Sequence, residues 1–157
     1  MRVASSCTLG VESECAMTAI RVLVADDHRA MREALTAVFA ADPRFHVVGE
    51  ACTVSETLEL ASVCCPDVVL LDVRMPGGGP DAVRATVGCC AHDGRPPVVV
   101  VVSASTRSHT VRAMLEAGAG GYLAKGGRGD LPDLVDRCVH GERVLAVPAA
   151  ARLEAGT

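Results

Sequence analysis

Five polar residues follow apolar runs of the chain and have the side chains that phosphoryl chemistry uses. They are Asp26, Asp27, Asp72, Ser103 and Lys125. Three carboxylates in one crevice repel each other, and a divalent cation or an ammonium group relieves that repulsion. Oxygen ligands of this kind favour Mg²⁺, which keeps several waters and shares phosphate oxygens. With a hydroxyl and an ammonium added, the set suits a phosphoryl group.

Each of these residues also has an ordinary structural explanation. An aspartate after a strand often forms a turn or caps a helix, and Asp27 could serve only to cap the helix that follows His28. Ser103 could cap a turn, and Lys125 could be an exposed lysine. The occurrence of all the residues together at strand ends is therefore what predicts a site.

Apolar runs that alternate with helical patterns are expected to position these residues. Val-rich runs suit buried strands, and a more mixed run suits a strand near the sheet edge. The expected strands are 20–25, 45–51, 67–71, 97–102 and 121–124, of which 45–51 is the mixed run.

Helices are expected between the strands. The apolar spacing of Met31, Leu35, Val38 and Phe39 predicts an amphipathic helix that stops at Asp42-Pro43. A capping box, Thr53 with Glu56, opens a second helix that extends to about Cys64. Further helices are expected at 81–87, around Val111, Met114 and Leu115 up to Gly118, and at 131–139 with Asp130 as N-cap.

Five β–α units in succession predict an α/β fold, a flavodoxin-like (βα)5 doubly wound sandwich with a five-stranded parallel sheet. Ligands bind at the carboxyl ends of the strands in such a sheet, and the polar residues fall there. We expect residues 1–18 to be a disordered extension, 19–141 to form the domain and 142–157 to be a linker-like tail.

Composition narrows the class of protein. The formal charge of −4 gives no electrostatic footprint for nucleic acid, and there is no run of Lys and Arg, so no direct nucleic acid binding is expected. There is no secretory signal pattern and no apolar run long enough for a membrane span, which predicts a cytoplasmic protein without membrane contact. The eight cysteines contain no C-x-x-C pair, and we expect reduced thiols rather than a metal site at Cys89, Cys90 and His92.

Four stretches resemble the receiver domain of two-component response regulators. They read VLVADDH, VVLLDVRMPGGGP, VVVVVSAS and GAGGYLAK, and match in residue type, order and spacing over roughly residues 20–142. The segments ADDH, GEA and AGAGGYLAK…GERVL are most similar to NarL/FixJ-type transcriptional regulators, the group with a LuxR-type output domain. Many receivers have a proline after the lysine, whereas here Gly126 follows, as in many members of this group. The family's helix-turn-helix domain is not expected within residues 142–157.

The resemblance implies a metal site and a phosphoacceptor. Asp72 matches the residue that takes the phosphoryl group. Asp26, Asp27, Asp72 and the backbone carbonyl of Arg74 match the contacts to Mg²⁺.

The resemblance also implies the residues that respond to phosphorylation. Ser103 matches the hydroxyl that closes on the phosphoryl group, Lys125 the lysine that pairs with it, and Tyr122 the aromatic switch that then turns inward. Arg74 and Ser105 match positions that tune the lifetime of the phosphoryl group.

As a member of this family the chain would be phosphorylated by a sensor histidine kinase. Its output would be a change of partner or dimer affinity in transcriptional regulation, and it would not be an enzyme. A homodimer would form through the fourth helix, fifth strand and last helix, or through the first and last helices.

Three other functions remain open. A degenerate receiver would act as an interaction module without phosphate, although all the chemical positions are filled. A phosphatase of the haloacid-dehalogenase type would need a second aspartate where Arg74 stands. A nucleotide-binding domain would need a G-x-G-x-x-G after the first strand or a Walker sequence, and neither occurs.

Overall fold

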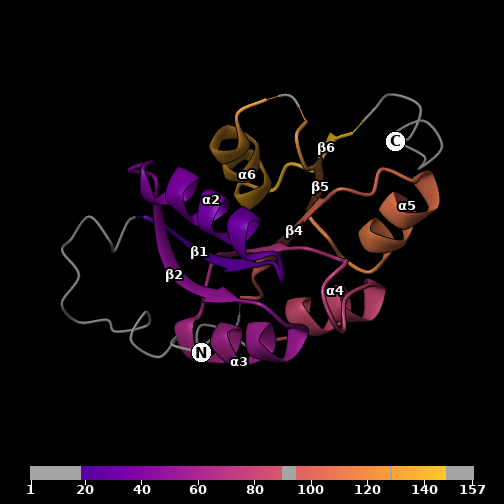
Figure 1. Ribbon diagram of the computed structural model, residues 1–157, viewed down its shortest axis with the longest axis horizontal. Coiled ribbons are helices and arrows are strands. Elements are labelled where there is room, and N and C mark those ends of the chain that lie inside the picture. The colour runs from indigo at the N-terminus through magenta and orange to yellow at the C-terminus, as the bar shows by residue number, and fades with distance from the viewer. Residues whose placement is uncertain (1–18, 90–94, 128, 148–157) are drawn as a thin grey trace.

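A computed structural model describes residues 19–89, 95–127 and 129–147, which form helices packed on a twisted sheet (Figure 1). In chain order the elements are β1 (Ile20–Ala25), α2 (Arg29–Ala40), β2 (Phe45–Ala51), α3 (Val54–Cys64), β3 (Val68–Leu71), α4 (Pro80–Val87), β4 (Val98–Ser103), α5 (Ser108–Glu116), β5 (Gly121–Ala124), α6 (Leu131–Val139) and β6 (Val144–Ala146). The expected strands and helices are all present.

All the strand pairs of the sheet are parallel, and the strand order is β2-β1-β3-β4-β5-β6. This is the flavodoxin-like order predicted from the sequence, with one strand added. The chain direction across the sheet reverses at β1, so the crevice between the ends of β1 and β3 is the expected place for a ligand.

The predicted count of five strands is wrong, because β6 extends the sheet to six strands. It pairs with β5 in the register Gly121↔Val144 and Tyr122↔Leu145. Three residues are too few to show a periodicity, so the stretch was expected to belong to the linker-like tail. Val144 and Val147 bury their side chains, one on each face of the sheet, which anchors the segment. The predicted extension 1–18 and residues 148–157 lie outside the described residues.

The central strands are buried on both faces, and successive residues point into two separate cores. Leu71 and Val101 lie in the core under α3, α4 and α5, whereas Leu70 and Val100 lie in the core under α2 and α6. Figure 1 shows α2 and α6 on one side of the sheet and α3 and α4 on the other. Burial on both faces explains why the strands are continuous apolar runs.

The capping box of α3 forms, with a small change in its geometry. The Thr53 hydroxyl accepts from the Glu56 N–H at 3.1 Å. The Glu56 carboxylate accepts from the N–H of Cys52, one residue before the cap, at 2.8 Å.

The structure contradicts one local expectation and decides two further details. Val38 was placed on the buried face of its helix but is 42% exposed, because the stripe covered by the sheet is narrow. Asp130 is the N-cap residue of α6, as predicted, although its side chain accepts no hydrogen bond from a helix N–H. The N-cap of α2 is His28, which leaves Asp27 free of the capping role that it could have had.

The cysteines are mostly as expected. Cys52, Cys65, Cys89 and Cys138 are free thiols, and burial raises the pKa of Cys138 to about 11. Cys64 is disulfide-bonded, which contradicts the expectation of reduced thiols at this position. The alternative metal site at Cys89, Cys90 and His92 is not tested, because Cys90 and His92 lie outside the described residues. In the described part of the chain, none of the helices has the length and apolar character of a membrane span.

The capping box leads to a prediction about stability. Thr53→Ala should lower the free energy of unfolding by about 1 kcal/mol, because an N–H at the start of α3 loses its acceptor. Urea unfolding would measure the change. Ser55→Ala, at an exposed position in the same helical turn, is the matched control and should change stability by less than about 0.5 kcal/mol. Equal losses for the two variants would show that the cap contributes nothing.

Candidate functional site

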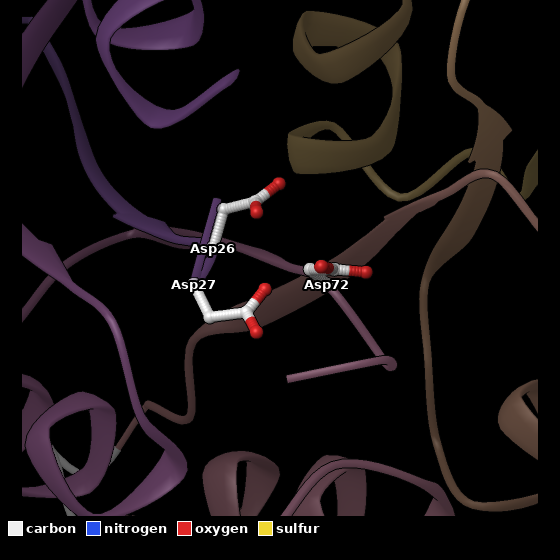
Figure 2. Close-up of side chains that lie close together, drawn as sticks. All are labelled: Asp26, Asp27 and Asp72. Carbon is white, nitrogen blue, oxygen red and sulfur yellow. The ribbon is translucent and has the colours of Figure 1, made fainter. Parts of the chain in front are cut away.

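Two adjacent strands bring the acidic residues together. Asp26 and Asp27 follow β1, and Asp72 follows β3 (Figure 2). The Asp26 N–H donates to the Ala51 carbonyl and the Asp72 N–H donates to the Ala25 carbonyl, each at 3.0 Å. The sheet's pattern of hydrogen bonds thus continues into the site and fixes the backbone of both residues.

One carboxylate oxygen from each of Asp26, Asp27 and Asp72 lies within 4.8 Å of the others. The Asp26 and Asp72 side chains are 1% and 4% exposed, and Asp27 is exposed. The cluster therefore has one side open to solvent and two ligands held by the fold. This is the grouping of carboxylates that the sequence predicts.

Lys125 reaches the cluster from the end of β5. Its ammonium lies 2.8 Å from Asp26 Oδ2 and 3.4 Å from Asp72 Oδ2, and its side chain is 16% exposed. Its backbone N–H donates to the Ser103 carbonyl at 2.8 Å, so the end of β4 fixes the backbone position of Lys125. In this structure the lysine is closer to Asp26 than to the expected phosphoacceptor.

The donor set fits a divalent cation. Three carboxylates face a single ammonium, so two formal negative charges remain uncompensated. One oxygen of Asp26 accepts from the His28 N–H at 2.8 Å, and one oxygen of Asp72 accepts from the Arg74 N–H at 3.1 Å. The other Asp26 oxygen, Oδ2, is buried and makes no hydrogen bond of good geometry, despite the ammonium beside it. A hard cation would satisfy such an oxygen.

Burial is the main influence on Asp72, and it raises the pKa of that carboxyl group above its usual value. The N–H of Arg74 and the charge of Lys125 act in the opposite direction, while the charge of Asp26 raises the pKa further. The anionic form of Asp72 is therefore held at a cost in free energy, which a bound cation would relieve.

Ser103, Ser105 and Tyr122 form a connected group beside the acidic cluster. Ser103 is fully buried, and its hydroxyl oxygen accepts from the Ser105 N–H at 3.1 Å. The Tyr122 hydroxyl donates to the Ser105 carbonyl at 2.6 Å, and the ring is fully buried. Burial also raises the pKa of Tyr122, although hydrogen bonds with Ser103 and Ser105 oppose this. Tyr122 thus points inward, towards Ser105.

The remaining predicted positions lie at the rim of the site. The Arg74 side chain is exposed, while its backbone N–H holds Asp72. Metal binding by the Arg74 carbonyl stays a prediction, as do the roles of Arg74 and Ser105 in phosphoryl lifetime.

One residue of the site was not found from the sequence. The Arg32 guanidinium donates to the backbone carbonyl of Asp26 at 2.8 Å. Its contact is with a backbone atom, and only its position on the polar side of the first expected helix could have drawn attention to it.

Comparisons with known proteins identify the family of this chain. The family model of the response regulator receiver domain matches residues 22–137. Response regulator GacA of Pseudomonas viridiflava is 36% identical over 137 residues, which are 85% of this chain and 62% of GacA. The probable transcriptional regulatory protein NarL of Mycobacterium tuberculosis (strain H37Rv) is 36% identical over 128 residues, 81% of this chain and 58% of that protein. The chain thus spans about three fifths of the length of these relatives.

Solved structures show the same fold. The signal receiver domain of the putative response regulator NarL from Mycobacterium tuberculosis has a TM-score of 0.72 and 33% identity, over 79% of this chain and 98% of that one. A LuxR-family two-component response regulator from Aurantimonas sp. SI85-9A1 has a TM-score of 0.76 and 25% identity, over 87% of this chain and 95% of that one. The predicted likeness to NarL-type regulators is confirmed, and the chain belongs to the response regulator receiver domain family.

Proposed function

We propose that this chain is a phosphorylation-dependent switch in which Asp72 accepts a phosphoryl group from a sensor histidine kinase with the help of Mg²⁺. The observation that carries the proposal is the position of Asp72, a buried carboxylate that lies beside both the acidic pair and the Lys125 ammonium. Family membership supports the same conclusion.

The two oxygens of Asp72 have different surroundings, which indicates how the transfer would occur. Oδ1 accepts from the Arg74 N–H, whereas Oδ2 faces Lys125 at 3.4 Å. Oδ2 is therefore the nucleophile in our proposal. It forms the new O–P bond as the P–N bond of the phosphohistidine breaks, and the leaving imidazole keeps the electron pair and takes a proton from solvent.

The residues around Asp72 would stabilise the transferred group. Lys125 would turn from Asp26 to a phosphoryl oxygen, since its ammonium already lies between the two carboxylates. Asp26, Asp27 and Asp72 would hold Mg²⁺, which when bound supplies positive charge to the phosphoryl oxygens. The Arg74 carbonyl is the proposed fourth protein contact to the cation.

The switch would run from Ser103 to the surface. The Ser103 hydroxyl accepts a hydrogen bond from the Ser105 N–H at 3.1 Å. A phosphoryl group on Asp72 would draw this hydroxyl towards itself and away from the Ser105 N–H. Ser105 also holds the Tyr122 hydroxyl, so the change would reach β5 and the helices beside it. We expect phosphorylation to favour the inward arrangement of Tyr122 that this hydrogen bond holds.

The output would be a change in protein contacts in the service of transcriptional regulation. The relatives named above support this role, although the chain spans only part of their length. One candidate dimer face is α5–β5–α6, where β6 now covers the outer edge of β5. The other is α2–α6, which lies on the opposite face of the sheet from α3 and α4 (Figure 1).

The degenerate receiver differs from this proposal in one measurable property. It would not take up a beryllofluoride phosphate mimic in the presence of Mg²⁺, whereas the proposed switch would. The phosphatase alternative lacks its acid/base group, because the residue two positions after Asp72 is Arg74 and its side chain is exposed.

Asp72→Asn should abolish incorporation of label from acetyl phosphate in the presence of Mg²⁺, because an amide oxygen is a poor nucleophile. Phosphate-affinity electrophoresis or mass spectrometry would measure incorporation, and circular dichroism would confirm that the variant is folded. Asp81→Asn, at a fully exposed carboxylate on α4, is the control and should be labelled like the parent. Equal labelling of Asp72→Asn and the parent would refute the assignment.

Mg²⁺ should stabilise the parent. At a concentration ten times the dissociation constant, the free energy of unfolding should rise by about 1.4 kcal/mol, because the cation binds only the folded chain. Urea unfolding at several Mg²⁺ concentrations would measure the rise. Asp27→Asn should remove most of it and Asp81→Asn none, so an undiminished rise in Asp27→Asn would count against the site.

The raised pKa of Asp72 predicts a pH-dependent stability. Because the folded-state pKa lies above the unfolded one, ionised Asp72 destabilises the fold at neutral pH, and this penalty fades as the pH falls through the folded pKa. Without divalent cations, Asp72→Asn should therefore be more stable than the parent at pH 7, with a smaller difference in acid. Urea unfolding in EDTA across this pH range would test it. A difference that grew in acid would contradict the stated cause.

A further inference from the structure

Arg32, in the first turn of α2, reaches back to the peptide group that joins the acidic pair. Its guanidinium donates to the Asp26 carbonyl at 2.8 Å, and its side chain is only 19% exposed. That carbonyl belongs to the planar unit that links Asp26 to Asp27. Its orientation therefore sets the direction in which the Asp27 side chain leaves the backbone.

The same guanidinium also contacts the edge strand. Its Nε lies 3.3 Å from a carboxylate oxygen of Glu50, next to the last residue of β2. The carbonyl of Ala51, the following residue, accepts from the Asp26 N–H at 3.0 Å. The peptide groups on both sides of Asp26 are thus tied to the end of β2, one directly and one through Arg32.

Asp27 has the greatest need of such a restraint. It is exposed, and within 19–89, 95–127 and 129–147 no hydrogen bond or ion pair holds its carboxylate. Asp26, in contrast, is buried and accepts from the His28 N–H. Figure 2 shows the Asp27 side chain extending from the end of β1 towards the space beside Asp72. The backbone is what holds it there.

We propose that Arg32 is a positioning residue for the candidate Mg²⁺ site: its link between Glu50 and the Asp26 carbonyl holds Asp27 in place to bind the cation. This inference rests on the metal site of the proposed function and adds a residue to it. Arg32 touches neither the cation nor the phosphoryl group, and acts through the peptide group of the acidic pair.

Loss of the Arg32 charge and loss of its positioning role should change Mg²⁺ affinity in opposite directions, which makes the proposal testable. A guanidinium near a cation site repels the cation, so removing only its charge should tighten Mg²⁺ binding. Loss of positioning should weaken binding, and residues that orient metal ligands typically change metal affinity by about 10–100-fold. The sign of the change therefore distinguishes the two roles.

The experiment compares Mg²⁺ dissociation constants, measured from amide NMR shifts, for the parent, Arg32→Gln and Arg29→Gln. Arg29 lies on the same helix turn, 82% exposed and paired with Glu33, so it matches the charge change without touching Asp26. Arg32→Gln should bind Mg²⁺ about tenfold more weakly. Arg29→Gln should bind as tightly as the parent or slightly more tightly. Binding by Arg32→Gln that equals or exceeds the parent's would overturn the proposal.

Two further variants protect the test against a general loss of folding. Arg32→Lys keeps the charge but cannot bridge the carbonyl and Glu50 with one planar group, so it should bind Mg²⁺ at an intermediate strength. Glu50→Gln leaves the bond to the Asp26 carbonyl and should lose less affinity than Arg32→Gln. If Arg32→Lys and Glu50→Gln both fold and bind like the parent, the positioning role is wrong.

A second readout needs no metal. Hydrogen exchange at the Asp26 and His28 amides should be several-fold faster in Arg32→Gln than in Arg29→Gln, because both amides are bonded within the restrained segment. Unchanged exchange would overturn the inference. If the parent bound no Mg²⁺, the proposed metal site would fail, and the exchange result would still decide whether Arg32 orders the acidic pair.

Discussion

The mutual repulsion of three carboxylates at one edge of the sheet is the constraint that organises this molecule. Asp26 and Asp72 are almost fully buried, and Asp27 adds a third charge from the solvent side. The sheet can hold them because backbone N–H groups donate to two of them and Lys125 contributes an ammonium. The compensation is incomplete, and a site with uncompensated negative charge responds strongly to an added cation.

The same edge connects this charge imbalance to distant surfaces. The Lys125 N–H donates to the Ser103 carbonyl, and the Ser103 hydroxyl accepts from the Ser105 N–H. The Ser105 carbonyl in turn accepts from the Tyr122 hydroxyl. Tyr122 lies on β5, directly opposite Leu145 of β6. A change at the acidic cluster therefore has a continuous path of hydrogen bonds and strand pairing to the last strand.

Most of the fold and the membership of the site could be predicted because they depend on local patterns. Apolar runs, the capping box at Thr53 and the polar residues after each run depend only on neighbours in sequence. Predictions failed where distant partners decide: β6 is stable because β5 offers an open edge, and Val38 is exposed because the sheet covers a narrow stripe of α2. The link from Arg32 to a backbone carbonyl has no side-chain signature, so only the folded chain reveals it.

The sequence by itself determined that Asp26, Asp27, Asp72, Ser103 and Lys125 end at one edge of a parallel sheet, since parallel strands present their carboxyl ends together. Only the tertiary structure decided how these residues are paired. It placed Lys125 closer to Asp26 than to Asp72 and turned Tyr122 inward onto Ser105. The reason is physical: strand order follows from chain topology and apolar pattern, whereas distances of a few ångströms between charges depend on how every layer packs around them.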